Sequence, residues 1–267
     1  MGDVLRRKCL LLVALALSTI IHADLIAQTL SSIRIVGREA TIEPRSLVDF
    51  PTAGVLPKGS FCSGVDFFQH GGLLTSFSIG ILNRVNIGIS YGGSNVIGSE
   101  KTTFNKTPGV NIKWRLLDES VQFAAVAIGF ESQGKEPYID STKRYTIKSP
   151  GFFIVASKNY YFLGFLSLHG GVNYSLERDD ADKDFNGFLG FEKTLGPAMS
   201  LVAEYNLGTN DDHGKALGRG RGYLNIGWRW SVAEGFALGF DLKNLVKNQP
   251  QQTFANRVLR LEYARYF

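Results

Sequence analysis

The sequence predicts an all-β fold: a single antiparallel transmembrane β-barrel of about 12 strands that follows a cleaved N-terminal signal peptide. Three observations carry this prediction. Apolar and polar residues alternate in a series of segments between residues 61 and 267. The connections between these segments are alternately very short and long, as in barrels with tight periplasmic turns and longer outward loops. Beyond the signal peptide, no stretch approaches the roughly 18 apolar residues of a spanning helix, so strands must make any membrane crossing.

The first 59 residues divide into two parts. Residues 1–23 are organised like a secretory signal, with Arg6, Arg7 and Lys8 ahead of an apolar stretch at 10–21 that is too short to span a membrane. We expect cleavage after Ala23, or as late as residue 27, and no lipid anchor because neither cysteine has a lipoprotein-type context. Residues 24–59 have no clear place among the strands, and we expect a periplasmic segment or a plug in the lumen. The barrel then comprises residues 60–267.

Period-two patterning and turn residues place the strands in chain order. They are expected at Phe61–Phe68, Leu73–Ile81, Val85–Gly92, Val110–Leu117, Phe123–Gln133, Phe152–Tyr160, Gly164–Ser175, Phe188–Leu195, Leu201–Leu207, Gly222–Val232, Phe236–Leu245 and Arg257–Phe267. Most are close to the roughly nine to eleven residues of a tilted membrane strand. Three of these segments, 123–133, 152–160 and 188–195, alternate poorly, so the sequence does not settle their register.

In a membrane barrel the apolar face of each strand contacts lipid and the polar face lines the lumen. This division predicts the lumen-lining residues Asp66, Lys113, Arg115, His169, Glu204, Arg229, Asp241, Lys243, Arg260 and Glu262. Both signs of charge are well represented. A barrel of about twelve strands is wide enough to hold water or to be crossed by ion pairs. Two interpretations therefore stay open: ion pairs that brace a nearly filled lumen, or a selective conduit.

Composition limits the possible partners. Removal of residues 1–23 takes away three basic residues and Asp3, which leaves 26 basic and 23 acidic residues and a net charge of +3. This charge is too small to demand a nucleic-acid partner. Cys62 is then the only cysteine, so no intramolecular disulfide can form.

The last strand carries a more local signal. Leu259, Leu261, Tyr263 and Phe267 share one face, and the chain stops on that phenylalanine. The pattern resembles the C-terminal signature by which bacterial outer-membrane barrels are recognised for insertion, so the insertion machinery is an expected partner.

No catalytic residue, metal or cofactor is expected. Ser167 and His169 share a face, but that face is in the lumen, and no acid is placed to orient the imidazole. Asp180, Asp182 and Asp184 alternate as in a calcium loop. However, Phe185 and Phe191 stand where such a loop needs Gly and Glu, so we expect a solvated acidic loop.

Four stretches resemble the YjbH family of outer-membrane proteins, which are associated with exopolysaccharide and capsule production. They are Asp49–Gly59, Ile112–Glu119, Ala127–Gly134 and Val155–Lys158. The resemblance implies an integral outer-membrane barrel that takes part in exopolysaccharide export or assembly, with polysaccharide or export-complex proteins as partners. As a barrel of the outer membrane, the protein is also expected to contact outer-membrane lipid and lipopolysaccharide. The residues themselves leave two alternatives: a porin-like diffusion channel, or a structural or surface-interaction barrel with a filled lumen.

Overall fold

The computed structural model describes residues 33–250 and 255–267. The expected signal peptide and residues 24–32 lie outside the described residues. Within the described ranges, no helix is long and apolar enough to cross a membrane.

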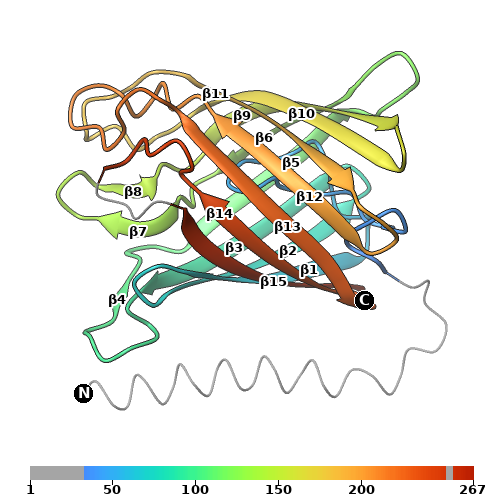
Figure 1. Ribbon diagram of the computed structural model, residues 1–267, viewed down its shortest axis with the longest axis horizontal. Helices are drawn as coiled ribbons and strands as arrows, with labels where there is room; N and C mark the ends of the chain where they lie inside the picture. Colours follow the sequence, from blue (N-terminus) through green and yellow to red (C-terminus); the bar gives the residue numbers. More distant parts are fainter. Residues whose placement is uncertain (1–32, 251–254) are drawn as a thin grey trace. The chain divides into compact units, whose positions relative to one another are not determined.

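Antiparallel strands form one large sheet that closes on itself (Figure 1). Its wall consists of β1 (Ser60–Phe68), β2 (Gly72–Leu82), β3 (Val85–Ser94), β5 (Gly109–Leu117), β6 (Ala125–Glu131), β9 (Gly151–Tyr161), β10 (Phe165–Tyr174), β11 (Asn186–Thr194), β12 (Met199–Asn206), β13 (Tyr223–Ala233), β14 (Phe236–Lys243) and β15 (Asn256–Tyr266). Neighbours in this order pair with each other, and β15 pairs with β1 to close the barrel. The predicted all-β barrel of twelve strands is therefore confirmed, with every predicted strand end within two residues of the observed one.

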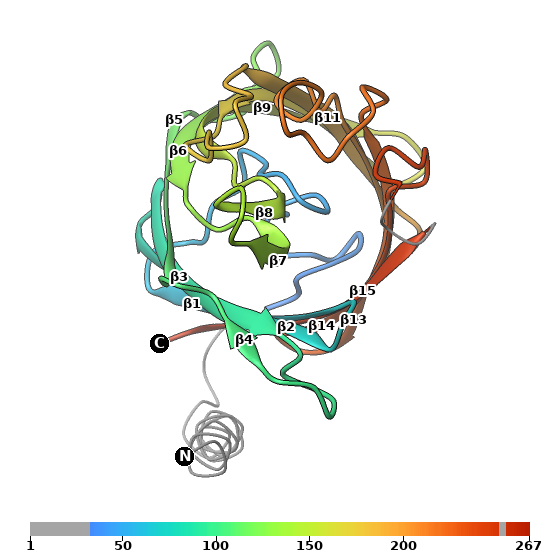
Figure 2. The same cartoon turned by 90° about the vertical axis from the view of Figure 1, so that its left-hand side faces the viewer.

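Three further strands were not expected. The two-residue strand β4 (Thr103–Phe104) extends the edge of β3. Strands β7 (Lys135–Ile139) and β8 (Arg144–Ile147) form a separate hairpin within the long connection between β6 and β9. Viewed along the barrel, this hairpin lies inside the ring of strands (Figure 2).

The two faces of the wall have opposite character. On β5, Val110, Ile112 and Trp114 are about half exposed on the outside, whereas Arg115 on the inner face is buried. Large apolar side chains are likewise exposed along the outer faces of most other strands, and buried asparagine, serine and charged side chains line the interior. This arrangement is the reverse of a soluble protein and fits an exterior that contacts lipid tails.

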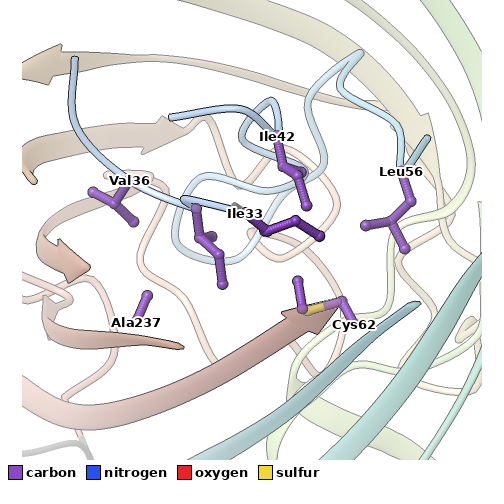
Figure 3. Packing of buried hydrophobic residues seen from close by; sticks show 8 residues of the cluster. Ile33, Val36, Ile42, Leu56, Cys62 and Ala237 are labelled. Atoms are coloured by element: carbon purple, nitrogen blue, oxygen red, sulfur yellow. The ribbon is translucent and has the colours of Figure 1, made fainter. Parts of the chain in front are cut away.

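Residues 33–59, which we call the inner segment, lie inside the ring of strands (Figure 2) and begin at the end with the short turns. At that end the Gly235 N–H donates to Ile33 O at 2.7 Å and the Arg38 N–H donates to Gly196 O at 2.9 Å. Ile33, Val36 and Leu56 of the segment pack on Cys62 and Ala237 of the wall, which forms an apolar cluster (Figure 3).

A second apolar cluster explains why the sequence of β9 is apolar on both faces. Phe153 and Val155 point inward and pack with Phe50 and Ala53 of the inner segment. The stacked rings of Phe50 and Phe188 extend this contact to β11, with centroids 4.6 Å apart. The inward apolar residues therefore have a partner inside the barrel, and burial against it stabilises the position of the segment.

Candidate functional site: the occupied lumen

All ten predicted lumen residues lie on the inner face of the wall, and seven of them contact the inner segment directly. Those seven are Lys113, Arg115, Glu204, Arg229, Lys243, Arg260 and Glu262. The other three, Asp66, His169 and Asp241, contact side chains that themselves bind the segment. The partner of these side chains is largely the backbone of residues 43–54, which the sequence did not indicate.

Glu204 of β12 holds the tip of the inner segment. One oxygen of its carboxylate accepts the backbone N–H groups of Val48, Asp49 and Phe50 at 3.1, 2.9 and 2.9 Å. The other oxygen accepts the side-chain amide of Asn225 at 3.0 Å. The carboxylate thus accepts hydrogen bonds from three successive N–H groups that would otherwise be buried without partners.

On the opposite wall, two basic residues of β5 bind carbonyl groups of the same segment. The Lys113 ammonium donates to the carbonyls of Arg45, Thr52 and Gly54 at 2.8, 3.0 and 3.0 Å. Arg115 donates to Ala53 O at 3.0 Å and forms an ion pair with Glu43. The segment thus offers N–H groups to an acid on one side and carbonyls to bases on the other, so its backbone is satisfied without a sheet.

Strands β13 to β15 and β1 are crossed by a chain of alternating charges. Arg229 pairs with Asp241, and Arg260 lies between Asp241 at 3.7 Å and Asp66 at 3.0 Å. The two guanidinium groups also donate to the inner segment, Arg229 to Leu47 O and Arg260 to Val48 O. Ion pairs that are both buried and hydrogen-bonded in this way hold a fixed geometry.

Lys243 joins the inner segment to the β7–β8 hairpin. Its ammonium lies 2.9 Å from an Asp49 carboxylate oxygen and 2.8 Å from a Glu136 carboxylate oxygen. Glu136 also accepts the side-chain amide of Asn256 at 2.8 Å. The two elements that occupy the barrel therefore share one buried cation.

His169 has a different partner from the one its spacing suggested. Its Nδ1 lies 2.8 Å from the Ser157 hydroxyl of β9, and Ser157 Oγ accepts the N–H of Ala53 at 2.9 Å. Ser167 instead donates to Asn159. In these contacts the Ser157 and His169 pair serves to hold the inner segment.

The β7–β8 hairpin is fixed at the barrel end with the long loops. Arg144 of β8 is fully buried, and its guanidinium lies between the carboxylates of Asp180 and Asp211. Lys148 adds a second cation 2.7 Å from Asp180. Glu177 accepts the backbone N–H groups of Tyr145 and Ser149 at 2.9 and 3.1 Å, and burial raises the pKa of this carboxyl.

This network corrects the expectation of a solvated acidic loop. Asp180 and Asp182 are buried, and only Asp184 of the three is exposed. Asp182 accepts the N–H groups of Asp212 and His213 at 3.0 and 3.1 Å. The expectation was wrong because the partners of the loop lie outside it, on the hairpin and on the loop that follows β12.

The remaining solvent access of the inner face is uneven. From β9 to β15 most inward side chains are buried, whereas on the other side Asp66, Ser76, Ser78, Asn111 and Glu131 keep partial exposure. Between the inner segment and the wall there are also two small cavities of about 10 and 30 Å³. The smaller one is lined by Asp66, Asp241 and Lys243 among others, and each has room for one or a few water molecules.

A closed antiparallel barrel with an apolar exterior and a polar, charged interior defines the class: this chain is an integral outer-membrane β-barrel protein. No protein-family model matches the chain, and no curated protein matches it in sequence.

Several solved structures resemble the chain. The KdgM porin has a TM-score of 0.47 and 11% identity over 78% of this chain and 99% of its own. The COG4313 outer membrane channel from Pseudomonas putida F1 has a TM-score of 0.38 and 12% identity over 82% of this chain and 100% of its own. For Omp33 of Acinetobacter baumannii the values are 0.37 and 8%, over 78% of this chain and 97% of its own.

Proposed function

We propose that this protein is a porin-like channel for small polar solutes whose lumen is narrowed by the inner segment and the β7–β8 hairpin. The observation that carries the proposal is the unequal exposure of the lumen wall. Inward side chains of β1, β2, β5 and β6 keep partial exposure, although those of β3 between them are buried. Most inward side chains from β9 to β15 are buried. A polar strip beside a fixed obstruction is the arrangement expected of a constricted pore.

Planar-bilayer conductance of the refolded protein tests this proposal. The native chain is expected to give small, uniform steps, because only the strip beside the inner segment is available to ions. Deletion of residues 33–57 is expected to give much larger steps. As a variant that keeps the whole chain, Lys113→Met removes three bonds to the inner segment and is expected to add intermittent large steps to the small ones.

The second candidate is a structural or surface-interaction barrel with a filled lumen, which the burial of most inward side chains from β9 to β15 favours. Silence of the native protein, with steps only after deletion of residues 33–57, would support this candidate and overturn the channel. Large steps from the native protein would contradict both proposals, because neither allows an open lumen.

The resemblance to the YjbH family supports a separate proposal, a role in exopolysaccharide export or assembly with polysaccharide or export-complex proteins as partners. Its test is independent of conductance: the yield of exopolysaccharide after deletion of the gene. An unchanged yield would remove this role and leave the channel proposal untouched. Leu259, Leu261 and Tyr263 point outward on β15, and the exposed Phe267 directly follows the strand, which supports the proposal that the insertion machinery binds here.

A further inference from the structure

Basic residues gather on the outer ends of β12 to β15. Among the described residues from Gly214 to Leu259, the exposed charged side chains at this end are all basic: Lys215, Arg219, Arg221, Lys247 and Arg257. The acids in the same range do not offset them, because Glu234 lies in the short turn at the other end and Asp241 is buried in the lumen. In the loop between β10 and β11 the exposed charges balance instead, with Arg178 and Lys183 against Asp179 and Asp184. The charge at this rim is therefore concentrated by sector.

Arg221 lies just before β13, where the chain returns from the long loop to the barrel wall. Its backbone carbonyl accepts the hydroxyl of Tyr205 at 2.7 Å, and Tyr205 lies on the outer face of β12. Its N–H and that of Arg219 donate to the side-chain oxygen of Asn248 at 2.9 and 2.8 Å. Gly220, at a φ of 71°, allows the turn that brings both N–H groups to one acceptor. The backbone is thus fixed from two sides while the guanidinium remains exposed.

Arg257 lies on the lipid-facing side of β15. Its neighbours Asn256 and Val258 are buried inward, and the next outward residue along the strand, Leu259, is about half exposed. In the register of β14 and β15, Arg257 lies opposite Leu242. A cation on this face is costly among lipid tails and favourable at the level of anionic headgroups. Neither Arg221 nor Arg257 has a carboxylate partner within the described ranges.

We propose that this basic rim binds the phosphate groups of a phosphorylated glycolipid of the outer leaflet, with Arg221 and Arg257 as the phosphate ligands. Arginine suits this role because its planar guanidinium donates two parallel hydrogen bonds to phosphate oxygens. Lys215, Arg219 and Lys247 add to the positive potential of the sector. The outward side chains of β12 to β15, such as Ile226, Phe240 and Leu259, lie below the rim, where the acyl chains of the same lipid would pack.

The test is a titration of the refolded protein, comprising residues 24–267 in a nonionic detergent, with lipid A that carries both phosphates and with the same lipid after removal of its phosphates. The variant Arg221→Gln/Arg257→Gln is compared with Lys58→Gln/Arg84→Gln. The control removes the same charge from exposed residues at the opposite end. Binding is measured by native mass spectrometry, and barrel formation is checked in each variant by heat-modifiable migration in gels.

Native protein and control are expected to bind the phosphorylated lipid equally, and the rim variant at least about tenfold more weakly. All three are expected to bind the phosphate-free lipid alike. Equal binding by the rim variant and the native protein would overturn the site, as would an equal loss in the control. Displacement of the lipid by millimolar inorganic phosphate would identify a free-phosphate site and overturn the assignment to lipid.

Discussion

Lys113 offers the sharpest test of how the lumen is closed. Replacement by methionine keeps an unbranched side chain that is one atom shorter but removes the three hydrogen bonds to Arg45 O, Thr52 O and Gly54 O. A hydrogen bond to a charged group contributes about 1.5–3 kcal/mol, and bonds made by one group do not add fully. Because the ammonium is partly exposed, we take about 3 kcal/mol for the set. The ratio of undocked to docked inner segment should then rise by about a hundredfold.

The native chain contains its own reporter for this change. Cys62 is 3% exposed because Ile33, Ile42 and Leu56 of the inner segment cover it (Figure 3). When docking is faster than labelling, the rate of modification by a membrane-impermeant maleimide follows the undocked fraction. We therefore expect labelling of Lys113→Met to be about a hundredfold faster than that of the native protein.

A matched control is Lys193→Met, since the Lys193 ammonium also donates to two carbonyls, Leu163 O and Thr194 O, but both belong to the wall. Equal labelling rates for the Lys113 and Lys193 variants would refute the reasoning, because they would mean that Lys113 does not hold the inner segment.

Three further variants probe other contacts. Glu204→Ala leaves the N–H groups of residues 48–50 without their acceptor at a cost of about 1–3 kcal/mol each, so Cys62 labelling should again accelerate; an unchanged rate would show that water replaces the carboxylate. Arg144→Met leaves Asp180 and Asp211 without their shared cation at a cost of about 3–5 kcal/mol. Trypsin should then cleave after Lys148, which is 5% exposed in the native protein, whereas Lys143→Met, which loses only a surface pair with Asp179, should stay protected. Phe267→Ser should lower the amount of inserted protein in cells but leave refolding into detergent intact, and equal loss in both would indicate a folding defect instead of a recognition defect.

The strands could be predicted because their signal is local. Lipid contact requires apolar residues at every second position of a wall strand, so each segment shows the alternating pattern by itself. Even for β9, where the alternation fails, the predicted bounds 152–160 agree with the observed strand to within one residue at each end. Its inward residues Phe153 and Val155 break the pattern because they face the inner segment and not water.

The contents of the barrel were harder to predict because their partners are distant in sequence. Glu204 binds backbone N–H groups more than 150 positions away, and backbone donors leave no residue signature. The hairpin carries a weaker signal of this kind: Arg144 and Lys148 are basic, and the loop at 177–184 is rich in acids. Comparing the charges of the hairpin with those of the acidic loop, instead of interpreting each loop by itself, would have indicated the contact of Arg144 with Asp180.

The inner segment and the β7–β8 hairpin both narrow the lumen, and they are also linked physically. Lys243 neutralises Asp49 of the inner segment and Glu136 of the hairpin together, so withdrawal of either element leaves this buried ammonium with one carboxylate fewer. A buried charge that loses a partner raises the free energy of the partly open state. Because water can hydrate the ammonium once both elements have left, opening one element should cost more while the other stays docked, and the inner segment and the hairpin should undock together. If this coupling holds, Arg144→Met, which acts only on the hairpin, should also accelerate labelling of Cys62, and the acceleration should disappear in the Lys243→Met background.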